Sequence, residues 1–258
     1  MISLLAGTSR PMQTQTMATT AGILIIGNEV LSGKVQDANS PYLCQELRAL
    51  GVEVKRISVI PDDVDVIAAE AATFASAFDI VITTGGVGPT HDDVTIEGIA
   101  KGLDRSVITH PDLEQLVRKL YPGNLNDARR RLTMVPEGAD LFGQPDLAFP
   151  VVVVNNIYIF PGVPEILRQK FDAIKGRFRD APFFLKKVFV TTGESSIAEH
   201  LNAVMRAYPD LLLGSYPEYR NPEYRVRLTL ESKDSAYLDE AFDLLMSLLP
   251  PSSIAKVE

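Results

Sequence analysis

Short apolar runs rich in β-branched residues alternate with helical patterns between Ala21 and about Phe160, and this alternation restricts the chain to few folds. Strands that alternate with helices are typical of parallel βαβ units. Residues 79–84 (DIVITT) lack polar alternation, which indicates a strand buried on both faces of a parallel sheet. The sequence therefore predicts an α/β fold, a three-layer sandwich with a mostly parallel sheet.

The pattern changes after about residue 180. Residues 181–250 predict a strand, a helix, two strands and a helix, which is enough for a small α+β lobe. A chain of 258 residues fits one large and one small domain. We expect a ligand-binding domain at 21–180 and the small domain at 181–250. A disordered leader at 1–20 and a tail at 251–258 would flank them.

Two local signals predict where a helix and a turn lie. Asn39 or Ser40 is expected to cap the helix that follows them, because side chains of this kind accept hydrogen bonds from the first backbone N–H groups. Residues 151–160 resemble a tight hairpin. Its turn would be Asn155-Asn156, which can adopt the positive φ values of primed turns.

Charge and composition exclude several classes of protein. A formal net charge of −8 argues against a nucleic-acid partner, since binding to a phosphate backbone needs a basic surface. The single cysteine, Cys44, rules out an intrachain disulfide and fits a reducing compartment. No apolar run approaches the roughly 20 residues of a membrane-spanning helix, so no membrane contact is expected. We expect a cytoplasmic protein, with a mitochondrial presequence containing Arg10 as the alternative.

The most informative segment is the loop GGVGPTHD, which follows the strand at residues 79–84. Ligands of doubly wound sheets bind outside the carboxyl ends of the strands. Gly85, Gly86 and Gly88 would let backbone N–H groups approach a phosphate, and the next helix would aim its N-terminus there. Two known phosphate motifs do not match: the G-K-[ST] of a P-loop is missing, and His91 replaces the third glycine of a dinucleotide fingerprint.

Asp92 and Asp93 end this loop and have two interpretations. Either one can simply cap the following helix, which is the commoner role of aspartate at such a position. Beside a bound polyphosphate, however, carboxylates repel the ligand unless a divalent cation lies between them. The pairing of these aspartates with a glycine-rich loop therefore favours metal-assisted chemistry.

A second loop, from Gly27 to Asn39, ends another predicted strand. It offers Glu29 and Asp37 as ligands or bases, and Lys34 as a phosphate contact. The alternative is a polar loop in which Asn39 only caps the next helix.

Two further strand ends carry candidates of the same kind. At least one of Asp62 and Asp63 is expected to cap a helix. The segment 160–165 (FPGVPE) is either a plain turn or a second anion site, because its glycine leaves backbone amides open at a helix start. The basic cluster at 129–131 is predicted to be a solvated face, with an arginine that reaches a phosphate as the alternative.

Four of these segments together resemble a known family. They are IGNEVLSGKVQDAN (26–39), VIPDDVDVI (59–67), TTGGVGPTHDDVT (83–95) and FPGVPE (160–165). The chain is similar to the molybdopterin-binding MoaB/Mog family, and within it to the branch that contains the N-terminal domains of CinA and of eukaryotic FAD synthase. The similarity extends from about Gly22 to Pro250 and so covers both predicted domains.

The resemblance implies both a fold and a chemistry. Mog-type enzymes adenylylate molybdopterin, and their functional acidic residues match Asp62 and Asp93 here, with the GGVG and PGVP loops around the ligand. In the CinA and FAD synthase branch the same pocket is associated with metal-dependent cleavage of the pyrophosphate in FAD or ADP-ribose. This chain has Asp92 where Mog-type proteins have an arginine, which favours hydrolysis. FAD synthesis is expected to be absent, because no adenylyltransferase domain follows.

The prediction is therefore a metal-dependent pyrophosphatase with a defined site. Asp93, Asp92 and Asp62 are the predicted catalytic residues, and Asp93, Asp92 and Glu29 are the predicted ligands of Co²⁺, Mg²⁺ or Mn²⁺, with or without K⁺. Asp62 or Asp37 would orient the attacking water. The predicted substrate-binding residues are Gly85, Gly86, Gly88, Thr90, Gly27, Glu29, Gly33, Asp37, Asn39, Pro161, Gly162 and Pro164.

Two other functions fit the same motifs. One is a pterin-handling protein that binds or adenylylates molybdopterin, and the other is a non-catalytic ligand-sensing module, since a fold alone does not determine activity. In each case the partner is a small nucleotide or pterin ligand, and a homo-oligomer is expected.

Overall fold

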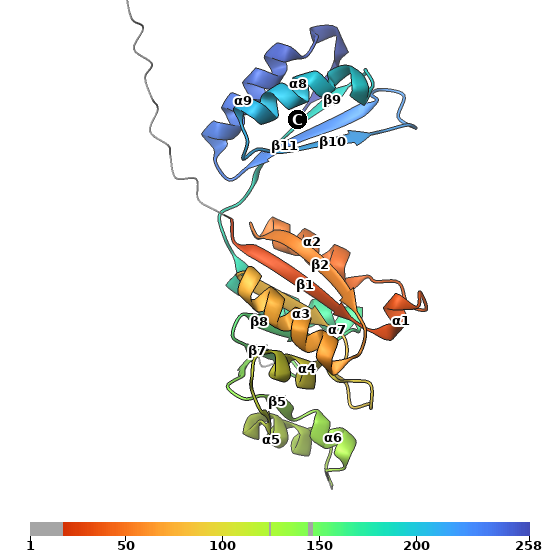
Figure 1. Ribbon diagram of the computed structural model, residues 1–258, viewed down its shortest axis with the longest axis vertical. Coiled ribbons are helices and arrows are strands. Elements are labelled where there is room, and N and C mark those ends of the chain that lie inside the picture. The colour runs from red at the N-terminus through yellow and green to blue at the C-terminus, as the bar shows by residue number, and fades with distance from the viewer. Residues whose placement is uncertain (1–17, 124, 144–146) are drawn as a thin grey trace, which may run out of the picture. The chain divides into compact units, whose positions relative to one another are not determined.

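The computed structural model describes residues 18–123, 125–143 and 147–258, which fall into two compact units. The larger unit is Ala18–Ala181 and the smaller one includes Pro182–Glu258 (Figure 1). The predicted boundary near residue 180 matches this division. None of the helices in the described part of the chain has the length and apolar character needed to cross a membrane.

The larger unit is built on a six-stranded sheet in the order β2-β1-β3-β8-β7-β6. Its first four strands are parallel, β7 runs antiparallel to them, and β6, which pairs antiparallel with β7, runs in the direction of the first four again. The bounds are β1 Thr20–Ile26, β2 Glu53–Ile60, β3 Ile80–Thr84, β6 Asp140–Phe142, β7 Val151–Val154 and β8 Ile157–Phe160.

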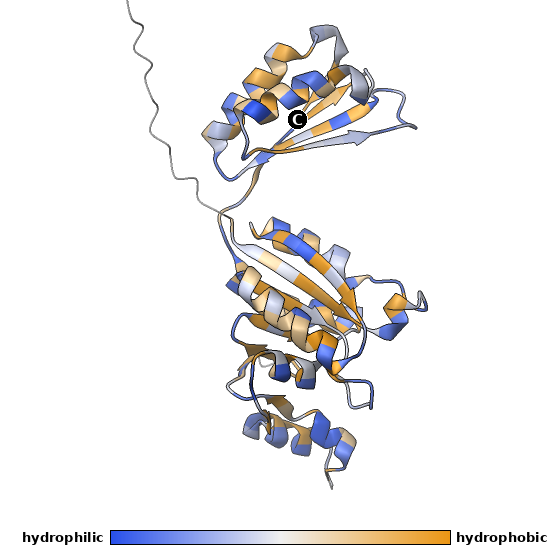
Figure 2. Ribbon diagram, in the orientation of Figure 1, coloured by the Kyte–Doolittle hydropathy of each residue, from blue (hydrophilic) through white to orange (hydrophobic). Residues whose placement is uncertain are grey.

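Helices cover both faces of this sheet, so the predicted three-layer sandwich is confirmed. In β1, Ile23 and Ile25 pack into the core beneath α2 (Asn39–Ala49) and α7 (Pro164–Ile174). The alternate residues Leu24 and Ile26 pack beneath α3 (Val64–Ala77) and α4 (Thr95–Gly102). β1 and β3 are buried along nearly their whole length, which is the pattern of strands covered on both sides, whereas Figure 2 shows hydrophilic residues along the edge strand β2.

A small subdomain is inserted between α4 and β6. It consists of β4 (Val107–Thr109), α5 (Pro111–Leu120), α6 (Asp127–Arg131) and β5 (Met134–Pro136). The strands β4 and β5 pair with each other and not with the main sheet. The predicted hairpin is confirmed nearby: β7 and β8 are joined by Asn155-Asn156, and φ of Asn155 is 53°.

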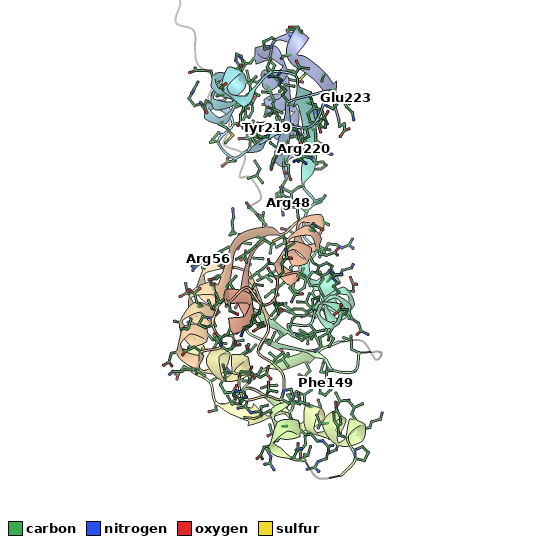
Figure 3. The ribbon with its side chains drawn as sticks, turned by 90° about the vertical axis from the view of Figure 1, so that its right-hand side faces the viewer. Arg48, Arg56, Phe149, Tyr219, Arg220 and Glu223 are labelled. Atoms are coloured by element: carbon green, nitrogen blue, oxygen red, sulfur yellow. The ribbon has the colours of Figure 1, made fainter. Side chains whose placement is uncertain are left out.

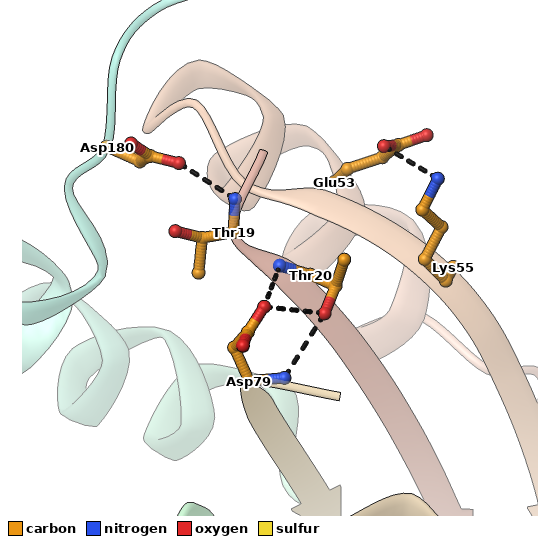
Figure 4. Close-up of polar contacts among 6 residues, drawn as sticks. All are labelled: Thr19, Thr20, Glu53, Lys55, Asp79 and Asp180. Carbon is orange, nitrogen blue, oxygen red and sulfur yellow. Dashed lines mark hydrogen bonds and ion pairs between the residues drawn. The ribbon is translucent and has the colours of Figure 1, made fainter. Parts of the chain in front are cut away.

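The start of the larger unit differs from the predicted leader. Residues 1–17 lie outside the described part of the chain, but Thr19 and Thr20 are held at the sheet, and β1 begins at Thr20. The Thr20 N–H and hydroxyl donate to the Asp79 carboxylate at 2.8 and 2.7 Å, and the Thr19 N–H donates to Asp180 at 2.9 Å (Figure 4). The hydrogen bonds from Thr20 lower the pKa of Asp79.

The smaller unit has a four-stranded sheet in the order β10-β11-β9-β12, packed against two helices. The predicted tail at 251–258 is wrong, because these residues form a 3-10 turn and a strand that pairs with β9. The bounds are β9 Phe184–Val190, α8 Glu194–Ala207, β10 Leu212–Pro217, β11 Val226–Ser232, α9 Ser235–Leu248 and β12 Ile254–Val257.

Candidate active site

Four loops meet at one edge of the large sheet, where β2, β1, β3 and β8 end. Because these strands are parallel, residues 27–38, 61–63, 85–94 and 161–163 all follow carboxyl ends at the same edge (Figure 1). The first loop contains a short helix, α1 (Asn28–Leu31). The predicted loops therefore converge, as the position of ligand sites in such folds requires.

The glycine-rich loop needs glycine for its shape. Gly85 has a φ of 105°, and a methyl group there would overlap the carbonyl oxygen of Ile26. Its N–H donates to Phe160 O at 3.2 Å, so Gly85 shapes the loop and its N–H is already engaged. Gly86 has a φ of 60°, and its carbonyl accepts from the Thr95 N–H at 3.0 Å. These bonds turn the loop onto the first residue of α4.

Asn39 joins the loops after β3 and β8. Its side-chain nitrogen donates to the Thr84 hydroxyl at 3.0 Å and to Gly162 O at 2.8 Å, and Asn39 is only 7% exposed. The Thr84 hydroxyl in turn donates to Pro161 O at 2.9 Å. The side-chain oxygen of Asn39 is buried without a hydrogen-bond partner in the described structure. Asn39 thus positions the PGVP loop.

Asp37 is the residue that caps α2. Its carboxylate accepts from the Asn39 N–H at 2.8 Å and the Ser40 N–H at 3.1 Å, and it also contacts the Ser40 hydroxyl. The prediction that Asn39 or Ser40 caps this helix is wrong. The carboxylate of Asp37 is therefore engaged at the start of α2, and its predicted role as a ligand or base stays a prediction.

The neighbours Asp62 and Asp63 have different roles. Asp63 caps α3, with its carboxylate accepting from Asp65 N and Val66 N at 2.9 and 3.0 Å. Asp62 instead accepts from the Asn28 N–H at 2.7 Å. One of its oxygens lies 3.3 Å from where a methyl group on Gly86 would be. Asp62 therefore faces the glycine-rich loop, and the expectation that one of the pair is a cap is confirmed.

Asp93 closes the glycine-rich loop on itself. Its carboxylate accepts from the Thr90 N–H at 2.7 Å and from the Thr90 hydroxyl. A methyl group on Gly88 would lie 2.6 Å from that carboxylate, so a side chain there would displace the carboxylate of Asp93. Neither Asp92 nor Asp93 caps α4, whose N-cap residue is Val94. Asp92 is exposed, and hydrogen bonding to Thr90 lowers its pKa.

Arg131, at the end of α6, holds this loop from the outside. Its guanidinium donates to Thr90 O at 2.9 Å and to Asp93 O at 3.1 Å, and it pairs with Glu97 at 3.7 Å. The prediction that the 129–131 cluster is only a solvated face is wrong for this residue. The only sequence feature that points to this contact is the run of three arginines, and that run does not show which of the three reaches the loop.

The predicted three-carboxylate metal site does not form. Among the residues that the structure describes, no group of three acidic, histidine or cysteine side chains is placed to hold a metal ion. Glu29 folds back over Gly27, whereas Asp93 is engaged with Thr90. The carboxylates of Glu29, Asp92 and Asp93 thus do not fit a resident metal. Of the other predicted residues, Gly33 lies in an exposed turn with open space around it, and Pro164 is the first residue of α7.

Comparisons with known proteins agree with this architecture. Residues 22–180 match the family model of a probable molybdopterin-binding domain, and residues 182–258 match the middle domain of FAD synthase. A protein of Archaeoglobus fulgidus is 35% identical over 88% of this chain and 96% of its own length. A probable FAD synthase of Caenorhabditis elegans is 31% identical over 89% of this chain, which spans 50% of that protein.

A solved structure also resembles the larger unit. It is the protein CinA of Thermoplasma acidophilum, described as having unknown function. The TM-score is 0.58 at 27% identity, and the match covers 63% of this chain and all of the other. The predicted resemblance to CinA and to FAD synthase is therefore confirmed.

Proposed function

This chain belongs to the family of probable molybdopterin-binding domains, and from that premise we propose that it hydrolyses the pyrophosphate bond of FAD or ADP-ribose. FAD would give FMN and AMP, and ADP-ribose would give ribose phosphate and AMP. The observation that carries the proposal is the position of Asp62, a carboxylate that accepts from Asn28 N–H of the neighbouring loop and lies beside Gly86 of the glycine-rich loop. The match of residues 182–258 to FAD synthase supports a flavin nucleotide as substrate.

In the proposed reaction, water attacks one phosphorus atom of the pyrophosphate. A new P–O bond forms, the bond from that phosphorus to the bridging oxygen breaks, and the bridging oxygen leaves with the other phosphate. Asp62 orients the water and accepts its proton. Backbone N–H groups of the Gly86–Gly88 segment face the charge that develops on the phosphate oxygens.

A divalent cation enters this proposal as part of the substrate. Mg²⁺ is commonly held by one or two carboxylates together with substrate phosphates, without an all-protein cage. The cation, Co²⁺, Mg²⁺ or Mn²⁺ with or without K⁺, would arrive on the pyrophosphate, and Asp92 and Asp93 at the end of the glycine-rich loop are the candidates to meet it. This arrangement is consistent with the lack of three converging side chains in the described residues.

The test is incubation of the purified chain with FAD or ADP-ribose, with and without each metal. Chromatography would follow FMN, AMP and ribose phosphate. We expect metal-dependent release of both products, and loss of release in Asp93→Ala. Asp140→Ala is the matched control, because Asp140 is an exposed aspartate of β6 outside the four loops. Full activity of Asp93→Ala would show that the glycine-rich loop does not take part in the reaction through Asp93.

The second candidate function is binding or adenylylation of molybdopterin. It is favoured by the description of the family model, which matches residues 22–180 and so nearly all of the larger unit. Tight binding of molybdopterin, together with no cleavage of FAD or ADP-ribose under any metal, would select it. Binding of a nucleotide without turnover would instead select a ligand-sensing module.

A further inference from the structure

A pocket of about 240 Å³ adjoins the four loops on the side of the inserted subdomain. Val87 of the glycine-rich loop and Pro161 of the PGVP loop are part of its wall, so it is continuous with the candidate active site. The opposite wall comes from the inserted subdomain, and Phe149 completes it. Figure 3 shows Phe149 where that subdomain joins the rest of the larger unit.

The pocket has the size of a two-ring group. An apolar cavity of about 150 Å³ in another protein takes up benzene, which has a single ring. A volume of 240 Å³ therefore suits a bicyclic ring and is small for a three-ring isoalloxazine. The walls are mostly aliphatic, with Ile96, Val152 and Ile159 among them, which is the usual lining for a flat heteroaromatic ring.

The polar groups of the pocket all donate hydrogen bonds. Arg131 and Lys170 are its only polar side chains among the described lining residues, and no carboxylate, amide or hydroxyl side chain accompanies them. Lys170 donates to Pro150 O at 2.8 Å, which uses one of its three N–H groups. Arg131 can in addition stack its guanidinium plane on a ring. The pocket therefore selects a ring that carries acceptors.

We propose that this pocket is a purine subsite, which binds the adenine ring of the nucleotide whose phosphates lie on the glycine-rich loop. The inference rests on the proposed function, because adenosine diphosphate is the part that FAD and ADP-ribose share. Adenine presents three unprotonated ring nitrogens to donors and has one amino group that needs an acceptor. A pterin of the 2-amino-4-oxo type also carries acceptors, but both its amino group and a ring N–H need acceptors, which the lining side chains do not supply.

The same geometry makes Arg131 a positioning residue. Its guanidinium lines the pocket and also holds the carbonyl oxygens of Thr90 and Asp93. A ring seated in the pocket thus touches the side chain that fixes the loop carrying Asp93. Arg131→Lys is expected to lower kcat for FAD and to weaken AMP binding together. A merely structural role would lower the unfolding midpoint without changing the ratio of AMP to pyrophosphate affinity.

Filling the pocket tests the proposal. Ile166 lines it from α7 and is 43% exposed, so Ile166→Trp adds bulk with little cost in folding. Leu120→Trp is the control, since Leu120 is equally exposed on α5 and does not line the pocket. Calorimetry with AMP should show at least tenfold weaker binding for I166W and unchanged binding for L120W, while inorganic pyrophosphate binds both alike. Unchanged AMP binding in I166W would overturn the proposal.

A second pair of variants tests the donor chemistry. Lys170→Met keeps the length of the side chain and removes its N–H groups, and Lys175→Met removes a lysine that pairs with Asp172 outside the pocket. We expect about tenfold weaker AMP binding for K170M only. Stronger competition by a free pterin than by adenosine would refute the adenine assignment. Because these are binding assays without turnover, they can succeed even where FAD cleavage fails, so the two proposals are tested separately.

Discussion

Two neighbouring carboxylates, Asp62 and Asp63, provide the sharpest test at the scale of single residues. Asp62→Ala should lower the rate of FAD cleavage by at least about 100-fold, since it removes the group that accepts the proton of water. Asp63→Ala should keep the rate and cost about 1 kcal/mol of stability, because it only removes the cap of α3. Steady-state kinetics and urea unfolding of both variants would measure this. Equal rates in the two variants would contradict the role of Asp62.

Lys170 gives a pH dependence of stability. Burial lowers its pKa from 10.5 to about 8. Between these values the unfolded chain binds more protons than the folded one, so stability rises with pH from about 8 to 10.5. The rise is at most about 3 kcal/mol. Urea unfolding at pH 7.5, 8.5 and 9.5 should show it in the wild type and not in Lys170→Met; parallel pH curves for the two proteins would contradict it.

The sequence predicts which loops converge at this edge of the sheet but not the contacts that each residue makes there. Every candidate loop was placed correctly, because a strand that is followed by glycine and aspartate leaves few alternatives. The sequence does not show that Asp37, and not Asn39, accepts the first N–H groups of α2, because both residue types are good caps. Only the tertiary contact of Asn39 with Gly162 distinguishes the two residues. Arg131 and Lys170 were missed because their roles depend on contacts across the fold.

At the scale of elements, the glycine-rich loop should tolerate no side chain at its first position. Gly85→Ala forces a methyl group against the Ile26 carbonyl at a positive φ and should cost about 3 kcal/mol or more. Gly33→Ala is the matched control. Gly33 also has a positive φ, 72°, but it lies in open space, so about 1 kcal/mol is expected. Urea unfolding would measure the loss of stability in both variants. Equal losses would show that the backbone near Ile26 shifts and accommodates the added methyl group.

Long apolar elements were predictable, and short ones were not. β1 and β3 are buried along their length, so they stand out in the sequence as apolar runs. β4, β5 and β6 have three residues each, too few to show a period. The inserted subdomain, which forms one wall of the pocket, contains β4 and β5, and the pairing of these two strands therefore could not be derived from the pattern.

At the scale of the whole molecule, each of the two units buries apolar clusters of its own. The smaller unit buries its own cluster, which includes Val188, Leu228 and Leu245, and this cluster contains no residue of the larger unit. β12 was missed as part of that core, because its four residues are mostly exposed and follow two prolines. The predicted homo-oligomer stays a prediction. All residues of the proposed site and of the purine subsite belong to the larger unit.

Separate cores predict separate unfolding. Leu228 is fully buried in β11, and Leu228→Ala should cost about 2 to 5 kcal/mol in the smaller unit, through lost burial and the cavity that remains. Hydrogen exchange followed by mass spectrometry should then show faster exchange in residues 182–258, with β1 and β3 protected as in the wild type. FAD cleavage should persist, because no residue of the site lies in the weakened unit. Faster exchange that also reaches β1 and β3 would mean that the two units unfold as one, and the site would then depend on both.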